Sequence, residues 1–587
     1  MNEFQIIVLA TPVFFVLIGL EFAWGHWRER RGTGHNNYRL NDSVNSISLG
    51  VLSQLGGVFS KLLSVGIYGA VFSSVALFPD TAFWSTWYGV ILALVFYDFC
   101  YYWVHRAGHR SAVFWAAHVV HHQSQQYNLS TALRQTSSGM LLSWVFYLPM
   151  AVAGVPPLIF GIVALIDLLY QFWVHTEQIG KLGWFDRVFC SPSNHRVHHA
   201  VNDPYLDKNY GGILVLWDRL FGTFKDEQEP CVYGTRSPLN SWDPLWANAE
   251  VYAVLLHDSW HAKHWGDKLR VWVKPPGWRP ADVALRFPKP DFEMAQVNLF
   301  NPSVSRTVQW FCGLQFVALL GAVSGILWFA DSWPVHQTVV LSLAVISAYW
   351  ALGAALQGRL GLLSVLMLES AALSTVGGTL GWENLYLLFK PLTMLLAIWM
   401  VARRAQPAHK NSRFQAWLAA ALTASLVGDV FLMLPGNFFI PGLAAFLVAH
   451  LCYLSLLRQG VPFLPSRSAL LGTLSFGVAM LSVLWSSLGD PVLKGAVSAY
   501  VGVIALMAAQ ALGRAQVLSD RQGDRAAQLT ALGACVFLLS DALLAVNRFV
   551  QPLPLASFWV LGSYYVAQWL LVHHAQATPA KVKQRNV

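Results

Sequence analysis

Nine of the nineteen histidines in this sequence lie between positions 105 and 199. They form three closely spaced groups and one single residue: His105 and His109; His118, His121 and His122; His195, His198 and His199; and His175. Residues three or four apart share one face of a helix, so each group would aim its imidazoles in one direction. Imidazole is the commonest metal ligand and suits iron, copper and zinc. Nine imidazoles are too many for one metal ion, so the pattern predicts a two-metal site.

The residues near these histidines bear on the kind of metal chemistry. Oxidation of an unactivated C–H bond needs an oxidant such as dioxygen activated on iron, which the cofactor would supply. Hydrolysis by two zinc ions normally uses several carboxylates, whereas carboxylates are sparse here, with Asp98, Glu177 and Asp186 as the candidates. We expect these three to orient histidines or to be surface charges. Oxygen chemistry on a lipid is therefore favoured.

The composition predicts a polytopic membrane protein. Of the 587 residues, 55% are hydrophobic and only 12% are charged, compared with about 25% charged in soluble proteins. The net charge of +9 is spread over short loops, which argues against nucleic acid as a partner. The six cysteines lie singly, so neither a disulfide framework nor a thiolate metal site is predicted.

Hydrophobic segments predict an all-α architecture. Spans of about 20 apolar residues are expected at 4–24 (a retained first span), 43–79 and 83–104, and ten more follow between 308 and 574. The stretch 139–174 contains prolines and is expected to be a helical hairpin that returns to its starting side. Residues 181–300 are more polar and are predicted to form a membrane-associated region.

Basic loops orient this array in the membrane. Arginine and lysine gather in loops 25–42, 403–412 and 514–526 and in the C-terminal tail. Alternating spans place all of these on one side, which the positive-inside rule makes cytoplasmic. The same count puts the nine histidines at the cytoplasmic face. A bacterial inner membrane and the endoplasmic reticulum both suit this topology.

The histidine segments resemble a known superfamily. The spacings HxxxH, HxxHH and HxxHH are similar to those of the fatty acid hydroxylase/sterol desaturase superfamily, and the flanking residues resemble its alkylglycerol monooxygenase branch. The similar stretches are 98–109, 122–135, 175–183, 193–199, 207–212 and 217–224. The resemblance covers about residues 1–300. It implies a diiron monooxygenase that hydroxylates the carbon beside the ether oxygen of an alkylglycerol, which then releases a fatty aldehyde.

The resemblance also implies cofactors and further site residues. All nine histidines, with His175 among them, would bind two iron ions, and O2 would be the co-substrate. Animal relatives draw electrons from tetrahydrobiopterin, so this pterin or another electron donor is expected. Asn128 and Arg134 are candidates for positioning the lipid head or the donor, and contacts within loops are an equal alternative.

Three charged residues lie inside apolar segments of the C-terminal half, namely Lys390, Asp429 and Asp541. Charges inside spans are costly and are candidates for function. The topology places all three in the outer half of the membrane, where a lysine between two carboxylates would lower the cost of burial and separate their pKa values. A structural ion pair is the competing interpretation. His450 and Tyr565 are weaker candidates.

These positions resemble the YhhN-like lysoplasmalogenase family over about residues 381–575. The similar motifs lie at 390–392, 426–434, 442–453, 532–541 and 564–568. The resemblance implies hydrolysis of the vinyl ether of lysoplasmalogens, which releases a fatty aldehyde. Protonation of a vinyl ether requires a carboxylic acid, and a second carboxylate would steady the cation or activate water. Asp429 and Asp541 are expected to share these roles, with Lys390 orienting one of them or the substrate phosphate.

The predicted organisation is a histidine-rich hydroxylase domain at 1–300, further spans at 301–380, a lysoplasmalogenase-like bundle at 381–575 and a basic cytoplasmic tail at 576–587. The predicted function is two-step degradation of ether lipids by one membrane enzyme. One alternative is a fatty-acid or sterol hydroxylase with an inactive second half. The non-enzymatic alternative is a membrane metal transporter that uses the histidines.

Overall fold

The computed structural model describes residues 3–404, 412–522 and 524–576, with the side chains at 60–65, 412 and 520–522 left out. The predicted basic tail, apart from Gln576, and Lys410 of the predicted basic loop lie outside these residues. Within them the chain is all-helical, and eleven helices are long and apolar enough to cross a membrane. The prediction of an all-α, multi-pass membrane protein is therefore confirmed.

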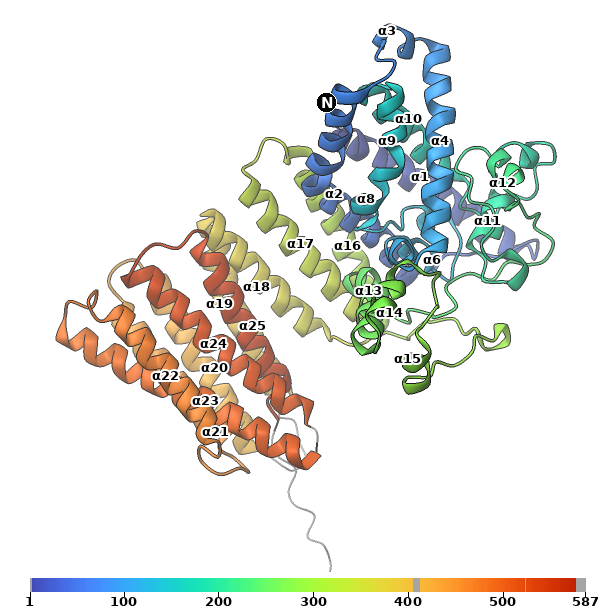
Figure 1. Ribbon diagram of the computed structural model, residues 1–587. Coiled ribbons are helices and arrows are strands. Elements are labelled where there is room, and N and C mark those ends of the chain that lie inside the picture. The colour runs from blue at the N-terminus through green and yellow to red at the C-terminus, as the bar shows by residue number, and fades with distance from the viewer. Residues whose placement is uncertain (1–2, 405–411, 523, 577–587) are drawn as a thin grey trace, which may run out of the picture. The chain divides into compact units, whose positions relative to one another are not determined.

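The chain folds into two compact units (Figure 1). The N-terminal unit comprises Met1–Val335 and Tyr349–Arg359, and the C-terminal unit comprises His336–Ala348 and Leu360–Val587. The boundary divides helix α17 (Val335–Leu356): His336–Ala348 belong to the C-terminal unit, and the rest of the helix belongs to the N-terminal unit.

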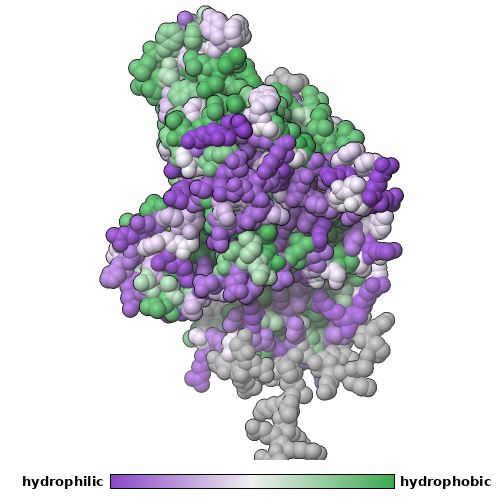
Figure 2. All heavy atoms as spheres, turned by 90° about the vertical axis from the view of Figure 1, so that its right-hand side faces the viewer, coloured by the Kyte–Doolittle hydropathy of each residue, from purple (hydrophilic) through white to green (hydrophobic). Residues whose placement is uncertain are grey.

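Long helices form the framework of the N-terminal unit. They are α1 (Glu3–Arg30), α2 (Leu40–Val75), α4 (Trp87–Arg110), α10 (Pro157–Trp173) and α16 (Arg306–Phe329). The short α3 (Thr81–Trp84) precedes α4, whose first turn is capped by the hydroxyl of Thr86, an acceptor for the amide of Gly89. Leu77, Trp87 and Ile91 in this region are exposed. Figure 2 shows hydrophobic surface at this end of the unit and hydrophilic surface below it, as expected for a membrane-embedded part with a polar region beside it.

The predicted hairpin at 139–174 is confirmed. It consists of α8 (Gly139–Ser143), the 3-10 helix η1 (Trp144–Tyr147), α9 (Leu148–Ala153) and α10. Gly154 makes the turn at φ +100°, and an added Cβ there would lie 2.1 Å from the carbonyl oxygen of Phe78. The tip thus packs beside the segment that leads into α4. The return helix α10 ends one residue before Val174, which brings His175 to the far end of α4.

Short helices and loops make up the polar part of the N-terminal unit. They are α5 (Ala112–Ala116), α6 (Val119–His122), α7 (Leu129–Ala132), η2 (Phe185–Arg187), α11 (Pro192–His199), η3 (Asp203–Tyr205), α12 (Leu216–Leu220), α13 (Pro244–His261), α14 (Trp265–Val273), α15 (Ala281–Arg286) and η4 (Met294–Gln296). The histidine motifs lie in α4, α6 and α11, so this region is built around them.

Eight helices and part of α17 form the C-terminal unit as far as the structure describes it. The eight helices are α18 (Leu362–Leu380), α19 (Glu383–Arg404), α20 (Ser412–Met433), α21 (Phe439–Leu457), α22 (Arg467–Leu484), α23 (Pro491–Gln522), α24 (Arg525–Phe549) and α25 (Ala556–His574). Its core contains fully buried residues from seven of them, among them Met367, Met394, Ala421, Tyr453, Met507, Phe537 and Leu571. Small residues let the helices approach closely: a Cβ on Gly377 would lie 2.6 Å from the amide of Tyr386.

Candidate functional site

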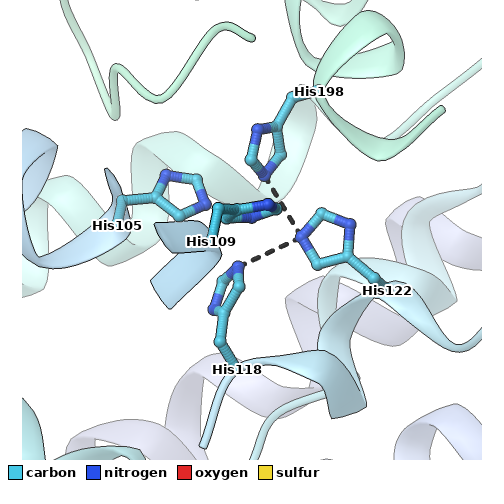
Figure 3. A group of neighbouring side chains, drawn as sticks. All are labelled: His105, His109, His118, His122 and His198. Atoms are coloured by element: carbon cyan, nitrogen blue, oxygen red, sulfur yellow. Dashed lines mark hydrogen bonds between the residues drawn. The ribbon is translucent and has the colours of Figure 1, made fainter. Parts of the chain in front are cut away.

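The fold brings the nine predicted histidines together in two groups. The first, site A, contains His105, His109, His118, His122 and His198 (Figure 3), and the second, site B, contains His121, His175, His195 and His199. Within each group, ligand nitrogens lie within 4.8 Å of one another, and among the described residues no carboxylate or thiol belongs to either group. His175, which had no partner at helical spacing in the sequence, completes site B.

The HxxHH motifs are divided between the two sites. His118 and His122, four residues apart, face site A, whereas His121 faces site B. In α11 the pattern is reversed, because His195 and His199 face site B and His198 faces site A. Neighbouring helix positions point about 100° apart, so one short helix supplies ligands to two adjacent centres. The doubled histidine is therefore the feature that places two sites side by side.

Backbone carbonyls fix the protonation of the rings in both sites. His105 Nδ1 lies 2.8 Å from the carbonyl of Tyr210, and His198 Nδ1 lies 3.0 Å from that of Lys208. In site B, His121 Nδ1 contacts the carbonyl of Arg134 at 2.9 Å, and His175 Nδ1 contacts that of Gln171 at 2.8 Å. A carbonyl can only accept, so the proton lies on Nδ1 and Nε2 carries a free lone pair.

The Nε2 atoms of these rings fit metal ions. His121 Nε2 and His175 Nε2 are 3.1 Å apart, although neither has a proton to give the other. Two lone pairs at this distance repel unless a cation lies between them. With metal–nitrogen bonds of about 2.1 Å, ligands at a right angle are separated by about 3.0 Å. In site A, the buried Nε2 atoms of His105 and His109 have no hydrogen-bond partner, which metal ligation would explain.

Burial keeps these imidazoles in the form that binds metal. It lowers the pKa of His121 to about 4, and it lowers the pKa values of His118 and His199 well below the ordinary value of imidazole. Neutral imidazole is the ligating species. The site is therefore ready to bind cations without first losing protons at neutral pH.

Two buried aspartates hold the loop that supplies carbonyls to site A. Asp98 accepts from the amides of Ile213 (2.7 Å) and Leu214 (3.0 Å) and from Trp217 Nε1 (2.9 Å). Asp218, which the sequence analysis missed, accepts from the amides of Tyr210 and Gly211 at 2.8 Å each. The described contacts of Asp98 include no histidine of site A or site B. Asp98 acts through the loop whose Tyr210 carbonyl holds His105.

The other two carboxylates near the motifs also make protein contacts. Glu177 accepts from Asn37 and from Tyr233 (2.8 Å) and lies 3.2 Å from the exposed His35. Asp186 accepts from the amides of Leu182 and Gly183. Their described contacts reach no histidine of site A or site B, so neither orients a ligand directly.

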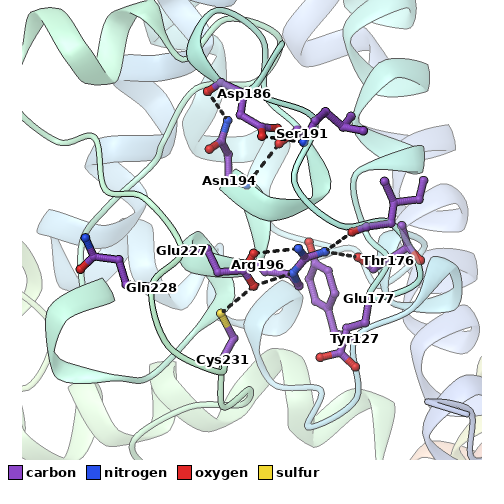
Figure 4. Close-up of polar contacts among 12 residues, drawn as sticks. Tyr127, Thr176, Glu177, Asp186, Ser191, Asn194, Arg196, Glu227, Gln228 and Cys231 are labelled. Carbon is purple, nitrogen blue, oxygen red and sulfur yellow. Dashed lines mark hydrogen bonds and ion pairs between the residues drawn. The ribbon is translucent and has the colours of Figure 1, made fainter. Parts of the chain in front are cut away.

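Arg196 ties the helix α11 to the segment that follows His175 (Figure 4). Its guanidinium donates to Glu227 at 2.7 and 2.8 Å and to the carbonyls of Thr176 and Ile179. Bidentate arginine–carboxylate pairs are strongly directional. The bonds to the carbonyls of Thr176 and Ile179 hold α11 beside the segment that follows His175, and the Nε2 atoms of His195 and His175 are 3.0 Å apart.

The structure places Asn128 and Arg134 in supporting positions. Asn128 caps α7 and donates to the carbonyl of Asn37 at 2.7 Å. Arg134 donates to the carbonyl of Val120 at 2.6 Å and to Asn45 Oδ1 at 2.7 Å, while its own carbonyl accepts from His121. Both residues are fully buried. Their bonds hold the backbone on both sides of His121.

An apolar cavity of about 380 Å³ opens onto the histidines. Residues of α1, α2, α10 and α16 line it, among them Phe14, Val51, Leu168 and Leu327. His118, His121 and His175 form part of its wall, so both sites face it. A largely apolar pocket of this size with a few polar groups at one end suits a ligand with a hydrocarbon chain.

The three charged residues of the C-terminal unit form two separate groups. Lys390 Nζ lies 3.4 Å from Asp429 Oδ1 and donates to the hydroxyl of Tyr386 at 3.0 Å. Tyr564 donates to Asp429 Oδ2 at 2.6 Å. The expectation that Lys390 lies between two carboxylates is wrong, because its described contacts reach only one aspartate.

Asp541 has different partners. It accepts from the hydroxyl of Tyr500 and lies 3.3 Å from His450 Nε2, which is 2.9 Å from the same hydroxyl. Asp541 and Tyr500 line an apolar cavity of about 70 Å³ between α21, α22, α23 and α24, whereas Asp429 and Lys390 do not. His450 therefore belongs to the group. Tyr565 instead bonds to Ser374 at 2.7 Å.

The sequence analysis missed the tyrosines that complete these groups and one carboxylate in the N-terminal unit. Tyr386, Tyr500 and Tyr564 lie in apolar helices, where a buried tyrosine hydroxyl usually has a hydrogen-bond partner. Asp167 lies within the apolar helix α10. The rule that charged residues inside spans are functional candidates, which selected Lys390, also selects Asp167.

Comparisons with known proteins match this division. The fatty acid hydroxylase family matches residues 90–223, which contain all nine histidines, and the YhhN family matches residues 385–575, which contain Lys390, Asp429 and Asp541. The N-terminal half is 36% identical to human alkylglycerol monooxygenase over 335 residues, or 57% of this chain and 73% of that protein. No solved structure matches.

Two further relatives match the C-terminal half. A human lysoplasmalogenase is 40% identical over 162 residues, covering 28% of this chain and 64% of the relative, and a lysoplasmalogenase of Mycobacterium bovis is 31% identical over 177 residues, covering 28% and 63%. The chain is thus a membrane enzyme of the fatty acid hydroxylase family with a second domain. Within this family its N-terminal half is related to the alkylglycerol monooxygenases, and its C-terminal half is a YhhN domain.

Proposed function

We propose that the N-terminal unit is a diiron monooxygenase that cleaves the O-alkyl bond of alkylglycerols to give a fatty aldehyde. The single observation that supports this most is the pair of all-histidine sites at the end of a lipid-sized apolar cavity. We assign all nine histidines as ligands of two iron ions. When bound, the iron ions would supply the activation of O2 that C–H oxidation needs. Tetrahydrobiopterin or another donor would provide electrons.

The residues of the chain would then position the lipid and the ligands. The apolar wall of the cavity would hold the alkyl chain and exclude water, so that the carbon beside the ether oxygen stays next to the histidines. The loop held by Asp98 and Asp218 would keep the rings of His105 and His198 aimed at site A. Asn128 and Arg134 would act by holding the backbone around His121, without touching the lipid.

We further propose that the C-terminal unit hydrolyses the vinyl ether of lysoplasmalogens. Asp541 faces the cavity, so it would donate the proton to the β-carbon, while Tyr500 and His450 hold its carboxyl group. Asp429, paired with Lys390 outside this cavity, would stabilise from a greater distance the positive charge that develops on the substrate. Both units would then release fatty aldehydes from glycerol ethers.

Metal content and aldehyde release test both assignments. We expect about two iron ions per chain in the purified protein, with O2-dependent aldehyde release from an alkylglycerol and O2-independent release from a lysoplasmalogen. The variant His198→Ala should lose the first activity, whereas His261→Ala, which removes a partly exposed histidine outside both sites, should keep both. Oxidation of a sterol in preference to the alkylglycerol, or metal transport without O2 consumption, would contradict the assignment.

We propose that the chain's helices place sites A and B at the cytoplasmic face of a bacterial inner membrane or the endoplasmic reticulum, in accord with the basic loops. The proposed domains are a hydroxylase domain at 1–300, further spans at 301–380 and a lysoplasmalogenase-like bundle at 381–575. Labelling of single cysteines, introduced at an exposed site such as Lys263 in the polar region, tests the orientation: a reagent that cannot cross the membrane should label this site only after the cytoplasmic side is opened.

A further inference from the structure

A row of polar side chains lies along the cavity wall beside site B. Asp167, Gln171 and His175 are spaced four residues apart, so the first two share one face of α10 and the third continues it. Tyr101 of α4 donates to Gln171 Oε1 at 2.6 Å, and Gln171 Nε2 donates to Asp167 Oδ2 at 2.5 Å. All four side chains line the 380 Å³ cavity. We call Tyr101, Gln171 and Asp167 the polar row.

One acceptor of the polar row is left without a donor. Asp167 is 2% exposed, and its Oδ1 atom has no hydrogen-bond partner. On its other side lies Gly212, where an added Cβ would be 2.8 Å from this oxygen. A buried carboxylate oxygen without a donor is costly, more so within an apolar helix. Among the described residues the protein therefore supplies no hydrogen-bond donor to this oxygen, so a bound ligand would have to provide one.

The position of the polar row points to the ligand group that would supply this donor. The carbonyl of Gln171 accepts from His175 Nδ1 at 2.8 Å, so the row begins directly at site B. The remaining wall, with Phe14, Leu165 and Leu320, is apolar. A ligand that fills the cavity would therefore present hydroxyl groups to the row, its carbon–oxygen junction to the histidines and a hydrocarbon chain to the rest.

We propose that the polar row is the subsite for the two neighbouring hydroxyl groups of a glycerol head, with Asp167 Oδ1 accepting from one of them. This inference rests on the proposed monooxygenase function and adds a determinant of substrate choice to it. A lipid ether without free hydroxyls would leave Asp167 unpaired. Sites built to bond a hydroxyl reject analogues that lack it, because the buried partner is then unsatisfied.

Binding to the metal-free protein tests the subsite without turnover. The probes are 1-O-hexadecylglycerol and the same lipid with both hydroxyls methylated, with dissociation constants measured in detergent by calorimetry. We expect the wild-type protein to prefer the diol by about tenfold, the value of one hydrogen bond to a charged group. Asp167→Asn, which replaces the free acceptor by a donor, and Tyr101→Phe should each reduce this preference to about twofold.

Tyr68→Phe is the matched control. It removes a buried tyrosine hydroxyl that donates to the carbonyl of Val155 outside the cavity, so it should keep the tenfold preference. An unchanged preference in both Asp167→Asn and Tyr101→Phe would overturn the subsite, and if Asp167→Asn fails to fold, Tyr101→Phe decides alone. Failure of the proposed function would look different: the iron-loaded wild-type protein would release no aldehyde from the alkylglycerol.

Discussion

The histidine sites of the N-terminal unit and the aspartate groups of the C-terminal unit bury polar side chains in different ways. Sites A and B combine neutral rings whose Nε2 lone pairs face one another, as with His121 and His175 at 3.1 Å. Asp429 and Asp541 instead have protein partners, a lysine and a tyrosine for one and a tyrosine and a histidine for the other. The first region could hold metal ions, whereas the aspartates of the second region are balanced by partners within the protein. Metal removal should therefore separate the two activities.

The largest expected effect is the loss of oxidation when a ligand is removed. His121→Ala, or treatment with an iron chelator, should lower alkylglycerol oxidation by at least about 10³-fold, because the cofactor carries the chemistry. Vinyl ether hydrolysis should stay within about twofold of the wild-type rate. Aldehyde release from the two lipids, measured on the same preparation, checks this. Equal loss of both activities would show that the units are not independent.

The variant Asp541→Asn should have the opposite effect, with loss of hydrolysis and not of oxidation. Without its acid, vinyl ether hydrolysis should fall by about 10²- to 10⁴-fold, the usual contribution of general acid catalysis, while alkylglycerol oxidation and iron content stay unchanged. The control is Asp490→Asn, an exposed aspartate at the start of α23. Hydrolysis that survives Asp541→Asn but not Asp429→Asn would move the acid to Asp429.

A smaller effect is expected from the loop that supports site A. Asp98→Asn disturbs the three N–H bonds that hold residues 213–217 and should weaken iron binding by about 10- to 100-fold. Asp186→Asn also alters a carboxylate that accepts two backbone amides, but in a loop that offers no carbonyl to the histidines. Competition with a chelator of known affinity measures both. Equal weakening in the two variants would mean that the effect is general destabilisation.

The smallest effect concerns the hydroxyl that donates to Asp429. Tyr564→Phe removes one hydrogen bond, worth about 1 kcal/mol or more, and should slow vinyl ether hydrolysis by about fivefold. Tyr453→Phe removes an equally short bond to Gln568 in the same core and should leave the rate unchanged. The comparison of rates, with thermal unfolding measured in parallel, separates an effect on Asp429 from an effect on stability.

Much of the N-terminal site could be predicted from the sequence because its information is local. The i, i+4 spacing of His118 with His122 and of His195 with His199 predicts which rings share a helix face, and the structure groups them in that way. The spacing could not predict that His121 and His198 would cross to the other site, because this depends on how α6 packs against α11. The roles of Asp218 and of the carbonyls of Tyr210 and Lys208 also depend on contacts between distant segments.

Prediction was weaker in the C-terminal unit, because residues at a similar depth in a membrane need not touch one another. Lys390, Asp429 and Asp541 were expected at similar depth, yet Lys390 reaches only Asp429 among its described contacts. Which side chains meet depends on the rotation of each helix about its axis, and the apolar periodicity of a fully buried helix says little about rotation. For the same reason, Tyr500 and His450 were recognised as partners of Asp541 only in the structure.

The sequence by itself determined the class of this protein: a multi-span helical membrane chain with a histidine cluster in its first half and buried charges in its second. These features depend on composition and on spacing along single helices, which are local properties. Only the tertiary structure decided how nine histidines divide into two sites, that Lys390 is not shared, and that Asp167 faces the cavity with one oxygen unpaired. Each of these depends on the packing of helices that are far apart in the chain, where directions and distances, and not residue types, select the partners.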